Sequence, residues 1–290
     1  MGLDRPIFYR FPPSVVFTRK ERCINRLHRK SIVSYYSLGF TVNDRRIFIG
    51  DIHGHYDGLM NLLEAIAPGA NDQVYFLGDL IDRGPQSAQV VEFVRQSGYT
   101  SVLGNHEQLL LNALPQEGMS SQALHAWLYS GGQTTIASYS DTSQLLDHAE
   151  WIRTFPTYLD LGDIWLVHAG VHPTIPLAQQ TPQEYCWIRE EFHTIPKPYF
   201  QDKLIITGHT ITFTLPNVPP GGLAQGQGWL DIDTGAYHPR SGWLTGLDMS
   251  RQQVYQFNVL QNRIRTIPLM EAVIKVDPDQ IVRRHSLVHI

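Results

Sequence analysis

Five short polar motifs in this 290-residue chain combine glycine with Asp, His, Asn and Arg. They offer carboxylate, imidazole and carboxamide groups together, without any sulfur. Such a mixed oxygen and nitrogen set suits divalent Mn or Fe, with Zn as a further option, better than a structural zinc site or a calcium site. The motifs are Gly50–Gly54, Gly78–Gly84, Gly104–Glu107, His168–Gly170 and Gly208–Thr210.

These side chains are sufficient for two metal ions that share one ligand. Asp79 is the natural bridge, because a carboxylate has two oxygens. One ion would bind Asp51, His53 and Asp79, and the other would bind Asp79, Asn105, His168 and His209. Two ions about 3.5–4 Å apart can bind a phosphoryl group and hold a hydroxide for in-line attack. We therefore expect two divalent ions as cofactors, with Mn ahead of Fe or Zn.

The first three motifs each follow a segment with the pattern of a buried strand. Apolar runs at 46–50, 73–78 and 99–103 alternate with segments of helical spacing at 56–67 and 87–96. This alternation predicts an α/β fold with a parallel sheet. Because the carboxyl ends of such strands meet in one crevice, the motifs are expected to converge there.

The second half of the chain changes character. Residues 107–156 are predicted to be mostly helical, and residues 216–228 form a Pro- and Gly-rich loop. The remaining motifs again end predicted strands, which are expected at 158–161, 164–168, 204–208, 228–233, 242–248 and 253–259.

Composition excludes several classes of protein. The net charge of −4 does not indicate a chain built to coat nucleic acid, and no apolar run approaches the roughly 20 residues of a membrane span. Two cysteines, Cys23 and Cys186, cannot form a disulfide framework. With no secretory signal in the sequence, the expected location is the cytoplasm.

The expected organisation is an N-terminal arm over 1–45, a catalytic domain over 46–260 and a C-terminal extension over 261–290. Within the arm, residues 19–30 hold six basic side chains and one acidic side chain. This segment is either a solvated basic surface or a docking patch for an acidic partner, and its composition leaves both open.

The five motifs, their order and the spacings of 28 and 26 residues between Asp51, Asp79 and Asn105 resemble the phosphoprotein phosphatase family. This family lies within the calcineurin-like metallophosphoesterase superfamily. The resemblance covers about residues 46 to 250. It implies a central β-sandwich flanked by helices, with the site at the carboxyl ends of the strands.

The resemblance also implies roles for individual residues. His106 would protonate the leaving alkoxide, and Asp82 would orient it. Arg83, Asn105 and Arg189 would bind the substrate phosphate, Arg189 because Trp187–Arg189 matches a Trp-x-Arg segment of bacterial and phage members. The nucleophile would be the hydroxide that bridges the metals, so no Ser or Cys is needed.

Three residues favour a protein phosphatase of the bacterial and phage type. His53, Asp82 and Glu107 follow its pattern, whereas Asp231–Ala236 replaces the late signature of eukaryotic members. The resemblance implies hydrolysis of phosphoserine and phosphothreonine, with phosphotyrosine left open. It also implies an open site without a tyrosine over the metals and no eukaryotic-type regulatory subunit.

Two other enzyme activities fit the same metal core. The alternatives are a symmetrical diadenosine tetraphosphatase and a broad small-molecule phosphoesterase. A scaffold without activity would require loss of ligands, and every ligand position is filled here. No nucleic acid or membrane partner is expected.

Overall fold

A computed structural model of the chain describes residues 44–114 and 121–281. The basic segment at 19–30, and nearly all of the predicted arm, lie outside these residues. In the described part of the chain, no helix has the length and apolar character of a membrane span.

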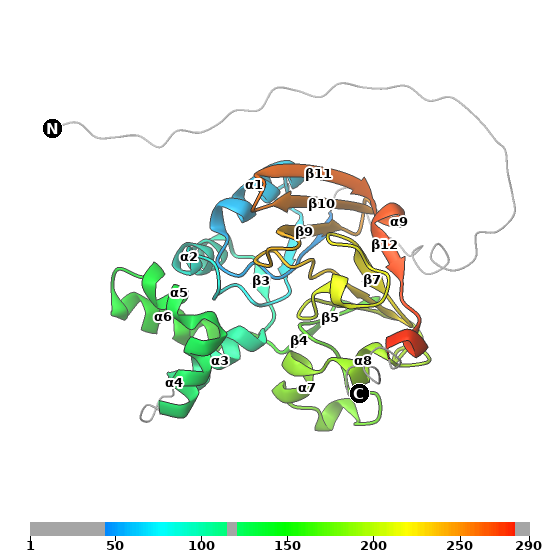
Figure 1. The fold of residues 1–290 in the computed structure, drawn as a ribbon, viewed down its shortest axis with the longest axis horizontal. Coiled ribbons are helices and arrows are strands. Elements are labelled where there is room, and N and C mark those ends of the chain that lie inside the picture. The colour runs from blue at the N-terminus through cyan, green and yellow to red at the C-terminus, as the bar shows by residue number, and fades with distance from the viewer. Residues whose placement is uncertain (1–43, 115–120, 282–290) are drawn as a thin grey trace, which may run out of the picture. The chain divides into compact units, whose positions relative to one another are not determined.

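Two six-stranded sheets form the centre of the fold (Figure 1). The first sheet has the order β11-β10-β9-β1-β2-β3 and the second has the order β12-β7-β8-β6-β5-β4. The strands of the first sheet are β1 (Arg46–Ile49), β2 (Gln73–Phe76), β3 (Thr100–Ser101), β9 (Trp243–Asp248), β10 (Gln253–Asn258) and β11 (Arg263–Pro268). The strands of the second sheet are β4 (Tyr158–Asp160), β5 (Ile164–Val167), β6 (Leu204–Thr207), β7 (Leu223–Gln225), β8 (Trp229–Asp231) and β12 (Val273–Lys275).

The two sheets pack face to face. One apolar cluster contains buried side chains from both, including Phe48 and Leu247 of the first sheet and Leu166 and Ile206 of the second. Burial of such side chains contributes about 25 cal/mol per Å² of apolar surface, which makes this layer the main reason the sheets stay together. The expected α/β sandwich is confirmed.

Helices cover the outer faces. On α1 (Tyr56–Ile66), the apolar residues predicted from helical spacing are buried, and the helix packs on β9 and β10 (Figure 1). The other helical elements are α2 (Ser87–Ser97), α3 (Asn105–Ala113), α4 (Ser121–Trp127), the π-helical turn η1 (Leu128–Gly132), α5 (Gln133–Ser138), α6 (Thr142–Ile152), η2 (Leu177–Gln179), α7 (Pro182–Trp187), α8 (Glu190–His193), η3 (Thr212–Thr214) and α9 (Leu269–Ala272).

The strand pairing matches the sequence pattern only in part. β1, β2 and β3 are parallel as predicted, but β9 pairs antiparallel with β1, so the first sheet is mixed. The segment predicted as a loop at 216–228 contains β7. It was missed because three residues between Gly222 and Gly226 carry too short a pattern to indicate a strand.

The predicted boundary at residue 260 falls inside the fold. β11 pairs with β10, and β12 pairs with β7, so the segment predicted as an extension supplies an edge strand to each sheet. β11 begins with two exposed residues and then alternates half-buried and exposed ones, as suits an edge strand. This pattern leaves no apolar run that would indicate a strand.

Candidate active site

Loops from both sheets build the site. The loops after β1, β2 and β3 carry three of the motifs, and the loops after β5 and β6 carry the other two. Glycine is needed where these loops touch. Gly78 has a φ of +87°, and a Cβ there would lie 2.6 Å from the Gly104 nitrogen, while a Cβ on Gly208 would lie 2.1 Å from Asp51 Oδ1. The motif glycines therefore permit close approach of the five loops.

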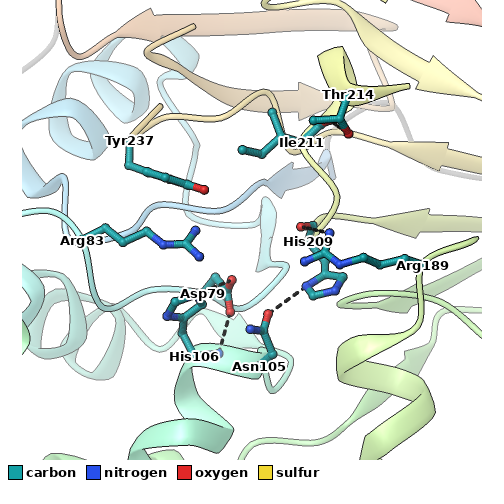
Figure 2. Close-up of a pocket in the computed structure, with 9 residues that line it drawn as sticks. All are labelled: Asp79, Arg83, Asn105, His106, Arg189, His209, Ile211, Thr214 and Tyr237. Atoms are coloured by element: carbon teal, nitrogen blue, oxygen red, sulfur yellow. Dashed lines mark hydrogen bonds and ion pairs between the residues drawn. The ribbon is translucent and has the colours of Figure 1, made fainter. Parts of the chain in front are cut away.

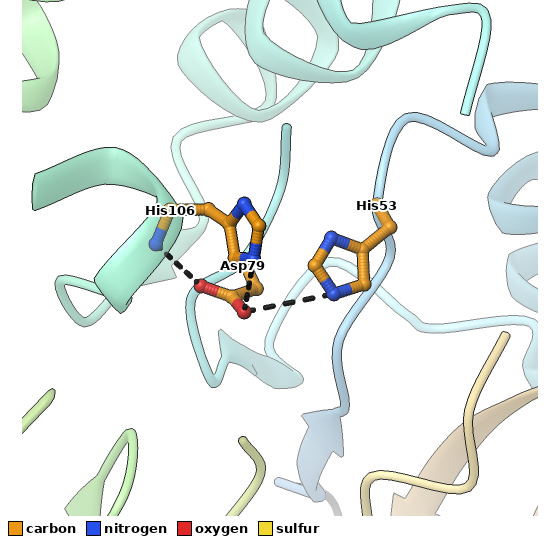
Figure 3. Close-up of side chains that lie close together, drawn as sticks. All are labelled: His53, Asp79 and His106. Atoms are coloured by element: carbon orange, nitrogen blue, oxygen red, sulfur yellow. Dashed lines mark hydrogen bonds and ion pairs between the residues drawn. The ribbon is translucent and has the colours of Figure 1, made fainter. Parts of the chain in front are cut away.

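The first donor group consists of His53, Asp79 and His106. One ligand atom from each lies within 4.8 Å of the others, and all three residues are buried. Asp79 Oδ2 is 3.6 Å from His53 Nε2 and 3.9 Å from His106 Nε2, and Figure 3 shows the three side chains pointing toward one another.

The second donor group consists of Asp79, His168 and His209, again within 4.8 Å and buried. The Asn105 carboxamide oxygen lies among them, 2.9 Å from His168 Nε2 and 2.8 Å from His209 Nδ1. Asp79 Oδ1 faces His168 Nε2 at 3.4 Å. Asp79 thus belongs to both groups, with one oxygen directed at each.

Asp51 lies beside these groups and outside both. Its carboxylate accepts a hydrogen bond from the His209 amide, at 3.1 Å to Oδ2. Burial, together with the charges of Asp233, Asp79 and Asp231, raises the pKa of Asp51 well above its usual value. The structure thus places His106 beside His53 and Asp79, and the assignment of Asp51 as a metal ligand stays a prediction.

The donor atoms have the character of a cation site. His168 Nδ1 donates to the Leu77 carbonyl at 2.6 Å, so its Nε2 carries a lone pair. That lone pair faces the oxygens of Asn105 and Asp79, which are also acceptors. Three acceptors facing one another in a buried place are satisfied by a cation between them. The residues therefore fit a metal ion.

The environment of His53, His168 and His209 favours the neutral imidazole, which is the form that binds metals. Burial lowers the pKa of His53 well below 6.5, and the charge of Arg83 adds to this effect. Burial likewise lowers the pKa of His209, helped by His168 and Arg189. Two adjacent buried groups of His and Asp in this state are consistent with a dinuclear metal site.

His106 forms a short hydrogen bond with a second carboxylate of the site. Its Nδ1 donates to Asp82 Oδ2 at 2.7 Å, and both side chains are buried. The ring nitrogen that remains, Nε2, faces Asp79. A histidine held through Nδ1 by a carboxylate is stabilised when protonated, so it can deliver a proton from Nε2.

A cavity of about 130 Å³ opens above these groups (Figure 2). Arg83 and Arg189 extend into it from opposite sides. The Arg189 guanidinium is held by the His209 carbonyl and the Thr210 hydroxyl, both at 3.2 Å. Two guanidinium groups over a cation site match the charge and geometry of a phosphoryl group.

Tyr237 also lines the cavity, so the expectation of a site without a tyrosine is wrong. Its ring stacks on the Arg83 guanidinium at 4.0 Å and meets the edge of the His53 ring at 4.8 Å. Tyr237 directly follows the Asp231–Ala236 segment in the sequence, and this position could have indicated it as a residue of the site. The cavity residues Ile211 and Thr214 carry no such signal.

Glu107 ties two of the loops together. Its carboxylate accepts hydrogen bonds from the amides of Asp79 and Leu80 at 2.8 Å and of Gly104 at 3.1 Å. Burial raises its pKa to about 8, with a further contribution from the charge of Asp79. Glu107 thus fixes the backbone on both sides of the shared carboxylate.

The backbone itself is unusual at the site. His53, Asp79, Asp82, Arg83 and His209 all have φ between +48° and +73°. Residues other than glycine seldom adopt this left-handed conformation, and each costs of order 1 kcal/mol or more. Such strain persists only where surrounding contacts fix the conformation, which is the case for the three loops that carry these residues.

Replacing Arg189 with Ala is expected to raise KM for phosphate monoesters and Ki for inorganic phosphate. A charged hydrogen bond is worth about 1.5–3 kcal/mol, which corresponds to roughly 10–100-fold. Steady-state kinetics with phosphate as inhibitor measure both constants. Arg251→Ala, on the exposed turn after β9, is the control. Unchanged KM and Ki would assign phosphate binding to other residues.

His193 supports Arg189 from below and gives a pH-dependent stability. Its Nδ1 donates to the Arg189 carbonyl at 2.7 Å, and burial lowers its pKa from 6.5 to about 4. The unfolded chain takes up the proton near pH 6.5, but the folded chain resists until about pH 4. Neutral His193 therefore makes its full contribution to the free energy of unfolding above pH 6.5. This contribution is lost as the pH falls toward 4, by up to about 3 kcal/mol.

We expect His193→Asn to flatten the loss of stability between pH 6.5 and 4. Urea unfolding at several pH values measures this, with the exposed His125→Asn as control. Equal slopes for wild type and His193→Asn would contradict the prediction.

The calcineurin-like phosphoesterase family model matches residues 45–213, so the chain belongs to this family. Curated relatives are symmetrical bis(5'-nucleosyl)-tetraphosphatases. The protein of Dechloromonas aromatica (strain RCB) is 34% identical over 128 residues, which is 43% of each chain. That of Methylococcus capsulatus is 37% identical over 128 residues, 43% of this chain and 42% of the relative. The match thus spans less than half the length of these relatives.

Solved structures share the fold. A crystal structure provisionally assigned as a diadenosine tetraphosphatase has a TM-score of 0.51 at 22% identity, covering 78% of this chain and 94% of that chain. A protein serine/threonine phosphatase from Saccharomyces cerevisiae has a TM-score of 0.54 at 16% identity, covering 79% and 81%. At these identities the likeness concerns the fold alone.

Proposed function

We propose that this chain is a metal-dependent phosphomonoesterase that removes phosphate from phosphoserine and phosphothreonine. The hydrogen bond between His106 and Asp82 carries the proposal. The alkoxide that leaves from serine or threonine is a strong base and needs a proton as the bond breaks. The nucleoside diphosphate that leaves when a phosphate anhydride is cleaved is a weak base, and it does not need this proton. A buried acid held by its own carboxylate is therefore the group that an alkyl phosphate requires.

The residues divide the work as follows. Arg83 and Arg189 bind the oxygens of the phosphoryl group from the two sides of the cavity. His106 delivers its Nε2 proton to the leaving oxygen, and Asp82 stabilises the charged ring before transfer. His53 and Asp79 on one side, and Asp79, Asn105, His168 and His209 on the other, would hold two divalent cations, which activate water and neutralise phosphoryl charge when bound.

A second candidate is symmetrical hydrolysis of diadenosine tetraphosphate. The observation that favours it is the 34–37% identity to proteins with that name. These comparisons favour the second candidate over the first, whereas the acid at His106 favours the first. Both use the same cation site and the same arginines, so they differ in the leaving group.

One assay separates the two candidates. With Mn added, kcat/KM is measured on phosphoserine, phosphothreonine and phosphotyrosine peptides, on p-nitrophenyl phosphate and on diadenosine tetraphosphate. We expect the phosphoserine and phosphothreonine peptides to be the best substrates. A dominant rate on the dinucleotide, with ADP as sole product, would establish the second candidate. Selective hydrolysis of p-nitrophenyl phosphate would indicate a small-molecule phosphoesterase.

A further inference from the structure

Asp82 is held on the side away from His106 by two residues that have no role so far. The Thr135 hydroxyl donates to Asp82 Oδ1 at 2.6 Å. The Trp127 indole Nε1 donates to the same carboxylate, at 3.1 Å to Oδ1 and 3.2 Å to Oδ2. Trp127 and Thr135 are buried, as is Asp82. Thr135 thus binds Oδ1, Trp127 spans both oxygens, and Oδ2 also accepts the hydrogen bond from His106.

Thr135 also holds the main chain of Asp82. Its hydroxyl oxygen accepts a hydrogen bond from the Asp82 amide at 2.9 Å, and the Ser87 hydroxyl accepts from the same amide at 3.1 Å. Asp82 has a φ of +73°, a conformation that needs external support. One hydroxyl thus fixes both the backbone and the carboxylate of this residue.

The π-helical turn η1 brings these two donors together. Trp127 ends α4 and Thr135 lies in α5, with the five residues of η1 between the two helices. Within the turn, Gly131 has a φ of +116°, and a Cβ on Gly132 would lie 2.6 Å from the Trp127 ring. The indole therefore folds across Gly132 toward Asp82. Turns of this kind occur often at functional sites.

We propose that Trp127 and Thr135 are positioning residues for the acid: they lock the Asp82 carboxylate in the orientation that presents His106 Nε2 to the leaving group. The inference rests on the proposed role of His106. Without these donors the carboxylate can rotate about its Cβ–Cγ bond, and the His106 ring loses its fixed partner. The segment from α4 to α5 thereby fixes the orientation of a side chain in the loop after β2.

A purely structural role predicts a different outcome. Loss of packing alone slows all substrates alike, because it disturbs the whole site. Loss of acid positioning slows a substrate in proportion to the basicity of its leaving group. The comparison of an alkyl phosphate with an aryl phosphate on the same variant distinguishes the two.

The variants are Thr135→Val, Thr135→Ser and Trp127→Phe, with Trp151→Phe in the following helix α6 as control for loss of an indole. We expect Thr135→Val and Trp127→Phe to lower kcat on a phosphoserine peptide roughly tenfold, as partial loss of acid catalysis, and on p-nitrophenyl phosphate less than about twofold. Thr135→Ser keeps the hydroxyl and should keep the wild-type ratio. Equal losses on both substrates would overturn the proposal.

A second readout needs no turnover. In the zinc-loaded protein, the Nδ1 proton between His106 and Asp82 is expected as a low-field ¹H NMR resonance, which His106→Asn assigns by removing it. Thr135→Val should shift or broaden this resonance, and Trp151→Phe should leave it in place. An unmoved resonance in Thr135→Val would overturn the positioning role, even if Trp127→Phe fails to fold. Absence of monoester hydrolysis by wild type would instead reject the proposed function.

Discussion

His106→Asn is expected to lower kcat on phosphoserine and phosphothreonine by about 10²–10⁴-fold, the usual contribution of a positioned acid. The loss should be far smaller on p-nitrophenyl phosphate, whose leaving group needs no proton. The reason is geometric, because Nδ1 of His106 is bound to Asp82 and Nε2 faces the shared carboxylate. Steady-state kinetics on the two substrates measure the difference.

His125→Asn is the control for this variant, because His125 is an exposed residue of α4. Metal content is measured in parallel, since His106 lies in the first donor group. Equal losses on both substrates together with lost metal would assign His106 to metal binding. Full activity on the peptides would reject it as the acid.

Asp79→Asn is expected to have the second large effect, because it removes the charge that both donor groups share while keeping the shape of the side chain. The stabilisation of transition-state charge by metal ions is worth several kcal/mol, and about 4 kcal/mol corresponds to roughly three orders of magnitude in rate. We expect a loss of that size on every substrate, with reduced metal content.

Asp202→Asn is the matched control at an exposed aspartate. Metal analysis by mass spectrometry and kinetics with added Mn measure the two effects. Retention of both ions and of activity in Asp79→Asn would show that Asp79 does not bridge the two groups.

The sequence predicted those parts of the fold that depend on local pattern. Short buried strands followed by Gly-Asp or Gly-Asn identify the loops after β1, β2 and β3, because local apolar runs and turn residues determine them. The two donor groups contain predicted residues for the same reason, since every member lies in a motif that follows a strand. Roles that rest on the resemblance, such as phosphate binding by Asn105, stay predictions.

Contacts between distant segments could not be predicted in this way. Trp127 and Thr135 reach Asp82 from 45 and 53 residues away, and nothing in their own neighbourhood indicates a carboxylate partner. β11 and β12 are strands only because β10 and β7 offer free edges. Tyr237 lines the cavity because of the path of the segment that connects β8 of the second sheet to β9 of the first.

The donors around Asp79 come from two separate sheets, three loops from one and two from the other. The first donor group comes from loops of the first sheet alone, whereas the second group joins Asp79 of the first sheet to His168 and His209 of the second. An ion bound by the second group would link the two sheets, and by mass action it would stabilise the docked state over any state in which the sheets have separated. Metal bound at this group would therefore contribute to the stability of the fold as well as to the chemistry of the site.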